Sequence, residues 1–130
     1  MKKILFLGML LCSVLVSGQN AQEIIDGLKT ELKSKPNAQR TASIYSDLTW
    51  YYANVSIDSA LHYGGRAIQE SKKLGDSTLL AQVYSDIGAV YLRRNDLGQS
   101  KESYLKSYAI RKAQKDQKGL AKIKIGRAHV

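Results

Sequence analysis

Residues 75–112 read GDSTLLAQVYSDIGAVYLRRNDLGQSKESYLKSYAIRK, and this stretch decides the fold. Its centre, YSDIG at 84–88, has an earlier counterpart in YSDL at 45–48, which lies 39 positions before it. A weaker echo pairs GD at 75–76 with KD at 115–116, at a spacing of 40. Self-similarity at a period of 20–50 residues is typical of stacked repeats. The sequence therefore predicts an array of repeats, about 40 residues each.

Apolar residues recur at helical spacing through both copies, as in Leu80, Val83 and Ile87. We expect one helix within 37–54 and, after the short connection at 55–56, a partner helix ending before Gly75. Gly75 suits a left-handed cap, and Asp76 or Ser77 can cap the next helix. Gly88 should allow a neighbouring helix to approach closely. Helices joined by short turns lie antiparallel, so the predicted fold class is all-α, built of antiparallel helix pairs.

Residues 1–18 have the organisation of a secretory signal peptide. Two lysines precede an apolar run over 4–16, and Ser17 and Gly18 follow it. The run is shorter than the roughly 18 apolar residues that span a bilayer, which disfavours the alternative of a membrane anchor. We predict cleavage after Gly18 or, alternatively, Ala21, and an exported protein at the periplasmic or extracytoplasmic face of the inner membrane. Cys12 is the only cysteine, so the remaining chain has no thiol.

The two ends of the predicted array differ from its middle. A helix over 19–36, with Ile24, Ile25, Leu28 and Leu32 in one apolar stripe, should cap the first repeat and be stopped by Pro36. Residues 115–123 resemble the start of a third repeat, because GLAKI at 119–123 corresponds to LLAQV at 79–83. Residues 124–130, KIGRAHV, resemble a translated sequencing adapter. We therefore expect a non-native tail after Ile123 and a truncated natural chain.

The chain is basic, with a formal net charge of +9, and most of the excess lies in residues 93–124. Such an end is compatible with anionic partners such as lipid headgroups or nucleic acid. Lysines scattered around helices are also typical of a solvated face, which is the interpretation we favour. We predict no nucleic-acid partner, and membrane association only through a segment downstream of this sequence.

No catalytic chemistry is indicated by the residue pattern. His62 stands beside Tyr63 in a predicted helix, without a cysteine or a carboxylate pair for zinc or acid–base work. The pair Gly64-Gly65 has no preceding strand and no phosphate-loop spacing. We predict no catalytic, cofactor or metal site, and we expect the tyrosines to belong to the core.

The second copy resembles the tetratricopeptide repeat. The family pattern W-x2-L-G-x2-Y, then A-x3-F, corresponds to Y-x2-I-G-x2-Y at 84–91 and S-x3-Y at 100–104. The first copy is looser, with Gly64 where the large aromatic residue belongs. We hypothesise that its bare backbone accepts the ring of Trp50 or Tyr51. An unrelated amphipathic helical bundle is the alternative.

The resemblance implies a right-handed solenoid with repeats over 37–74 and 75–114. In this family the inner helix of each repeat lines a concave groove that binds a protein or peptide. By position, the groove residues are Ser43, Ser46, Trp50, Ala53, Asn54, Gln82, Ser85, Ala89, Leu92 and Arg93. Some members of the family bind the C-terminal carboxylate of a peptide with a lysine, asparagine and arginine clamp. Only Asn54 and Arg93 approach that set here, so we do not predict recognition of a C-terminal carboxylate.

The repeat length and the signal peptide resemble the extracytoplasmic repeat arrays of Bacteroidetes-type signalling proteins. The resemblance implies a protein- or peptide-binding module, the N-terminal sensory fragment of a membrane-bound protein of the histidine-kinase type. One alternative is a free-standing periplasmic scaffold without enzymatic output. Another is an enzyme, a kinase foremost, whose catalytic domain lies beyond this fragment. No residue pattern specifies the ligand or the oligomeric state.

Overall fold

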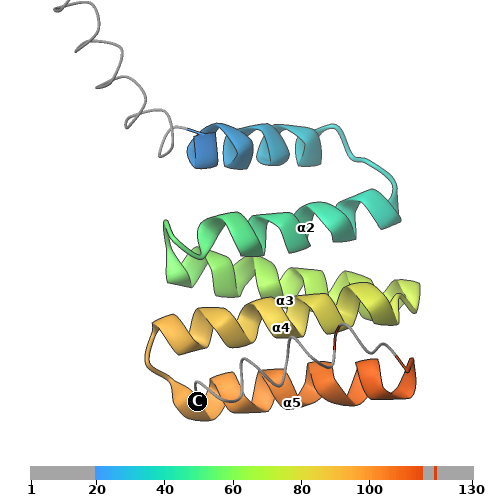
Figure 1. The fold of residues 1–130 in the computed structure, drawn as a ribbon. Coiled ribbons are helices and arrows are strands. Elements are labelled where there is room, and N and C mark those ends of the chain that lie inside the picture. Colours follow the sequence, from blue (N-terminus) through green and yellow to red (C-terminus); the bar gives the residue numbers. More distant parts are fainter. Residues whose placement is uncertain (1–19, 116–118, 120–130) are drawn as a thin grey trace, which may run out of the picture.

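The computed structural model describes residues 20–115 and 119. A first helix covers 20–33, and it is followed by α2 (Ala38–Tyr52), α3 (Ile57–Leu74), α4 (Ser77–Arg93) and α5 (Leu97–Ala113). Figure 1 shows the helices stacked in chain order, each running opposite to the one before it. The described residues contain no strand, so the predicted all-α array of antiparallel helices is confirmed. The predicted signal peptide (1–18), the predicted tail (124–130) and nearly all of 115–123 lie outside the described residues.

Helices α2 to α5 each begin at a side chain that caps free backbone N–H groups. Each cap oxygen accepts a hydrogen bond from the N–H three residues on, at 2.8–3.2 Å. The caps are Asn37, Ser56, Asp76 and Asp96. Of the two caps predicted for α4, the structure therefore uses Asp76.

Left-handed residues mark the helix ends at a period of 40. Lys35 (φ 53°), Gly75 (φ 66°) and Lys115 (φ 55°) follow the first helix, α3 and α5. Glycine adopts this conformation without a Cβ penalty, and the predicted Gly75 cap is confirmed. The first helix covers 20–33 rather than the predicted 19–36, since the residue before Pro36 is disfavoured in the α region. The first helix is thus followed by a left-handed residue, as are α3 and α5, the second helices of the two pairs.

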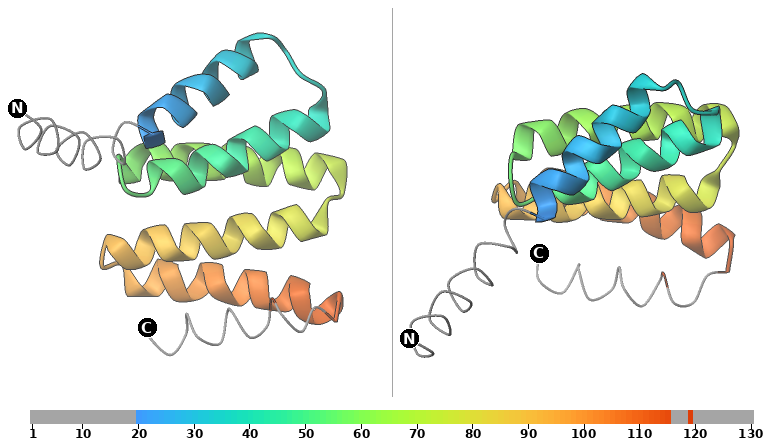
Figure 2. Two further views of the ribbon diagram at one scale, coloured as in Figure 1. Left: turned by 45° about the horizontal axis from the view of Figure 1, so that its top comes forward. Right: turned by 90° about the horizontal axis from the view of Figure 1, so that it is seen from above.

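The array consists of two helix pairs, α2 with α3 and α4 with α5, placed one beside the other (Figure 2). Helix α3 packs against both α2 and α4, and α2 also contacts α4. One core cluster, Ile25, Ile44 and Leu48, joins the first helix to α2. A second cluster, centred on Val83 and Ile87, joins α4 to α3. Burial of each such aliphatic side chain contributes about 1.5–3 kcal/mol.

Two glycines let neighbouring helices approach, although one has a different partner from the one expected. A Cβ on Gly88 would lie 3.1 Å from the ring of Tyr104, which confirms the predicted close approach. A Cβ on Gly64 would lie 2.8 Å from two side-chain carbons of Ile87. The hypothesis that Gly64 accepts Trp50 or Tyr51 is therefore wrong. The aliphatic side chain of the next repeat occupies that space, because α4 crosses α3 at this level.

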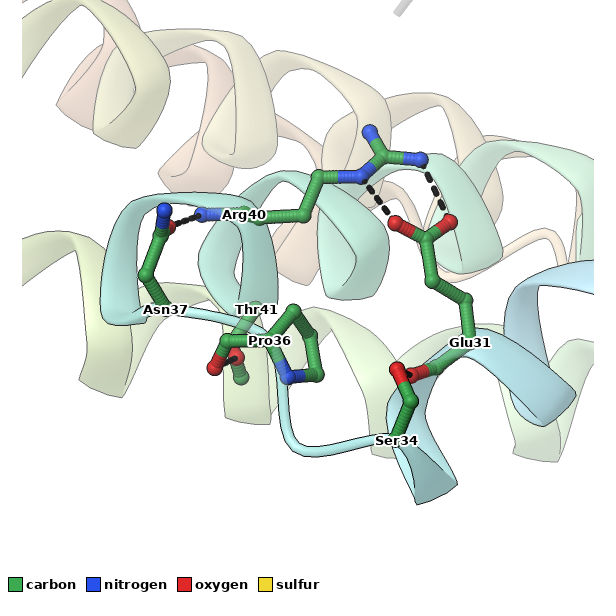
Figure 3. A network of polar contacts seen from close by, with 6 residues as sticks. All are labelled: Glu31, Ser34, Pro36, Asn37, Arg40 and Thr41. Carbon is green, nitrogen blue, oxygen red and sulfur yellow. Dashed lines mark hydrogen bonds and ion pairs between the residues drawn. The ribbon is translucent and has the colours of Figure 1, made fainter.

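The first helix is tied to α2 by a polar network around the Pro36 turn (Figure 3). The Arg40 guanidinium donates two hydrogen bonds to the Glu31 carboxylate, at 2.7 and 2.8 Å. The Thr41 hydroxyl donates to the Pro36 carbonyl at 3.2 Å, while the Asn37 cap accepts from the Arg40 backbone. The bidentate bond to Arg40 lowers the pKa of Glu31. This turn therefore fixes the angle at which the first helix meets the array.

Candidate peptide-binding groove

Helices α2 and α4 hold the predicted groove residues, and their C-terminal halves enclose a shallow hollow. We call this hollow the α2–α4 groove; its lining residues are Thr49, Trp50, Ala53, Asn54, Asp86, Ala89 and Arg93. Five of them, Trp50, Ala53, Asn54, Ala89 and Arg93, belong to the set predicted from the sequence. The hollow measures about 60 Å³, room for roughly two water molecules.

The rim of the α2–α4 groove carries an aromatic ring and a cation. Trp50 is 56% exposed, whereas Leu48 and Thr49, which precede it in α2, are fully buried. The Arg93 guanidinium donates a hydrogen bond to the side-chain oxygen of Asn54. This bond joins the ends of α2 and α4, and it links two residues that stand 39 positions apart. Ala89, with its small side chain, forms part of the wall between them.

Asp86 is a lining residue that the sequence analysis did not select. Only 7% of it is exposed, and its carboxylate accepts a hydrogen bond from the Gln82 amide at 2.8 Å. The Gln82 oxygen accepts in turn from the Arg111 guanidinium at 3.2 Å. These hydrogen bonds connect Arg111 of α5, through Gln82 of α4, to Asp86 in the groove. The sequence did contain a signal for Asp86, because the triplet YSD is repeated and Asp47 occupies the corresponding place in the first copy.

Two carboxylates, the buried Asp86 and the half-buried Asp47, belong to the electrostatics of α2 and α4. Burial raises the pKa of the Tyr104 hydroxyl, and the negative charge of Asp86 raises it further, whereas Arg93 lowers it. Burial also raises the pKa of Asp47, with Arg40 acting in the opposite direction. The groove thus contains both a carboxylate, Asp86, and a guanidinium, Arg93, and is not lined by charges of one sign only.

The remaining predicted groove residues lie elsewhere on the two helices. Ser46 and Ser85 are buried and are not among the residues that line the hollow, so the structure contradicts the expectation that their side chains line the groove. They are buried because α2 and α4 pack against neighbouring helices at these positions. Ser43, Gln82 and Leu92 are half-buried and do not line the hollow.

The described part of the chain contains neither a metal-binding cluster nor a helix suited to spanning a membrane. Among residues 20–115 and 119, no three His, Cys, Asp or Glu side chains are grouped so that they could hold a metal ion. His62 is exposed, and its ring meets the Tyr63 ring edge-on at 5.1 Å. Within the described helices, none is both long and apolar enough to cross a bilayer.

Antiparallel helix pairs stacked in chain order define a helical repeat domain, and the Y-x2-I-G-x2-Y pattern at 84–91 is of the tetratricopeptide type. Comparison with known families narrows this class. The family model described as the SusR N-terminal TPR domain matches residues 18–123, and the chain belongs to this family. No curated protein and no solved structure matches the chain. Tetratricopeptide domains generally mediate protein–protein interactions, and the domain described here is a repeat module of that non-catalytic kind.

Proposed function

We propose that this chain is a protein- or peptide-binding module, and that the α2–α4 groove holds a peptide segment. The observation that carries the proposal is the convergence of Trp50, Asn54 and Arg93 from two sequence copies onto one hollow. Tryptophan and arginine are the residues most enriched at binding hot spots. An exposed ring beside a cation on a rigid helix is a suitable anchor for a peptide.

The size of the groove indicates how a peptide would lie. A hollow of about 60 Å³ is too small for a large side chain, so the peptide crosses over it rather than filling it. The Trp50 face takes an apolar side chain, and the guanidinium of Arg93, which has five N–H donors, bonds a peptide carbonyl as well as Asn54. The Asp86 carboxylate disfavours an acidic residue at this point of the peptide.

Peptides selected from a random display library on the folded chain provide the test, with calorimetry to measure dissociation constants. We expect Trp50→Ala and Arg93→Ala each to weaken binding about tenfold or more. Arg94→Ala and Leu105→Ala are matched controls. Arg94 is the neighbouring cation, which faces Asp58 at 3.9 Å, and Leu105 is an exposed apolar residue on α5. Peptides that bind all four variants equally would place the binding surface elsewhere.

The module is further proposed to be the sensory part of an exported, membrane-bound signalling protein of the histidine-kinase type. The signal-peptide pattern over 1–18 supports export. The family description places this domain at the N-terminus of SusR, an arrangement that agrees with a sensor preceding further segments. A free-standing periplasmic scaffold without enzymatic output is the second candidate, and the signal-peptide pattern over 1–18 supports its export equally well.

Sequencing the source gene past the codon for Ile123 separates these two candidates. A reading frame that continues into an apolar run of about 20 residues and a kinase domain would support the receptor. A stop codon soon after an intact final repeat would support the scaffold. Codons for Gly126 to Val130 in the genome would show that the tail is native.

A further inference from the structure

A second hollow lies on the opposite side of α4 from the groove. We call it the α3–α5 slot. It measures about 180 Å³ and is lined by Leu61 and Gly65 of α3, Tyr84 and Tyr91 of α4, and Ser103 and Lys106 of α5, among others. Tyr84 and Asp86 are two residues apart on a helix, which turns them about 200° from each other. The slot and the α2–α4 groove therefore share no lining residue and face different directions.

The first repeat shows how such a slot is filled. Tyr45 and Tyr52 lie seven residues apart on α2, a rise of roughly 10.5 Å. The Tyr63 ring of α3 lies 6.1 Å from the Tyr45 ring and 5.5 Å from the Tyr52 ring, stacked on both. These centroid distances place Tyr63 between the two rings. The Arg66 guanidinium lies 5.3 Å from the Tyr45 ring centre and donates a hydrogen bond to its hydroxyl at 3.2 Å.

The second repeat keeps the frame but changes the residue in the middle. Tyr84 and Tyr91 stand 39 positions after Tyr45 and Tyr52, and Lys106 stands 40 positions after Arg66. The Lys106 ammonium again lies over the tyrosine ring, 5.6 Å from the centre of Tyr84. The position that corresponds to Tyr63, however, holds Ser103, which lines the slot.

The slot is wide enough for an aromatic ring. Ser103, itself 7% exposed, carries no ring at the position of Tyr63, and the open hollow that it helps to line measures about 180 Å³. Benzene enters an engineered protein cavity of about 150 Å³. An aromatic ring in the α3–α5 slot would thus stack on Tyr84 and Tyr91 as Tyr63 stacks in the first repeat.

We propose that the α3–α5 slot binds the tyrosine side chain of a partner polypeptide. The walls contributed by Leu61, Tyr84 and Tyr91 suit a ring. The rim suits an uncharged hydroxyl, because Glu102 and Lys106 face each other at 3.0 Å and leave no net charge. Tyr63 is half-buried between its two partner rings, and the tyrosine of a partner chain lying along α3 and α5 would enter the slot in the same way.

Binding is tested by nuclear magnetic resonance titration of the chain with N-acetyltyrosinamide, which carries a tyrosine side chain on a peptide backbone. We expect millimolar binding, with shifts confined to the Gly65 and Ser103 amides and the Tyr84 and Tyr91 rings, and none for N-acetylalaninamide. The Trp50 indole should stay unchanged, which separates this site from the groove. Shifts with p-cresol but none with N-acetyltyrosinamide would overturn the proposal, since the slot would then take free small molecules only.

Variants of the lining residues sharpen the test. Ser103→Tyr restores the residue type of the first repeat and should abolish the titration shifts. Tyr84→Leu keeps apolar volume but removes a stacking ring, and it should weaken binding about tenfold even if Ser103→Tyr does not fold. Leu105→Ala, on the same helix and outside the slot, should bind as the parent chain does. Unaltered binding by a folded Ser103→Tyr chain or by Tyr84→Leu would show that the probe binds elsewhere.

Discussion

Gly64 and Gly65 are neighbours in α3 with different surroundings. A Cβ at Gly64 would lie 2.8 Å from Ile87 carbons, whereas nothing lies within 4 Å of a Cβ at Gly65. Replacing a helical glycine by alanine gains about 1 kcal/mol from backbone entropy. At Gly64 this gain is offset by overpacking, which costs about 1–3 kcal/mol. In urea melts we expect Gly65→Ala to be about 1 kcal/mol more stable than the parent chain. We expect Gly64→Ala to be at least about 1 kcal/mol less stable than Gly65→Ala. Equal gains in both variants would mean that Ile87 moves aside freely.

Tyr104 should make the free energy of unfolding decrease at alkaline pH. Burial and the charge of Asp86 raise its pKa above the ordinary 10.0. The unfolded chain therefore loses this proton at a lower pH than the folded chain, so the stabilising contribution of the neutral phenol is lost as pH rises beyond about 10. Stability measured by denaturant melts between about pH 9 and 11 should fall less steeply in Tyr104→Phe than in the parent chain. Equal slopes of stability against pH in the two proteins would contradict this effect, since the lysines and the remaining tyrosines titrate in both.

At the scale of helices, two buried serines connect α5 to the backbone of α4. The Ser100 hydroxyl donates to the Gly88 carbonyl at 2.8 Å, and the Ser107 hydroxyl donates to the Ala81 carbonyl at 2.6 Å. In α3 the positions 40 residues earlier are Ala60 and Ala67, both buried. We expect Ser100→Ala and Ser107→Ala each to cost about 0.5–1.5 kcal/mol in thermal or urea unfolding. The two costs should add within about 0.5 kcal/mol, because the bonds share no partner. A neutral double variant would show that these bonds do not hold the pair together.

The helix boundaries could be predicted because they depend on near neighbours. Ser56, Gly75 and Asp76 act on backbone groups within three or four residues of themselves, so the sequence contains the whole interaction. The partner of Gly64 could not be predicted, because Ile87 reaches it from another helix. Burial of Ser46 and inclusion of Asp86 in the groove likewise depend on how α2 and α4 pack. The resemblance to the tetratricopeptide repeat indicated which helices form the groove, whereas its lining depends on how those helices are placed.

For the whole molecule, the contacts follow the order of the chain. Helix α3 contacts α2 and α4, α5 contacts α4, and the first helix joins α2 through Ile25, Ile44 and Leu48. Stability in such arrays is nearly a sum of units and their interfaces, so damage at one end need not reach the other. Local opening should therefore differ along the chain.

Amide hydrogen exchange can measure this spread directly. Ile25 is fully buried, and Ile25→Val should cost about 0.5–1.5 kcal/mol, enough to raise exchange several-fold in the first helix. Exchange in α5 should change little, because α2, α3 and α4 separate the two. Ser107→Ala is the matched variant at the far end, and it should accelerate exchange in α5 while leaving residues 20–33 as they are. If either substitution instead raised exchange equally in every helix, the array would open only as one cooperative unit. The groove would then lose its shape whenever the first helix detached, whereas in a graded array α2 and α4 keep the groove intact while the ends open.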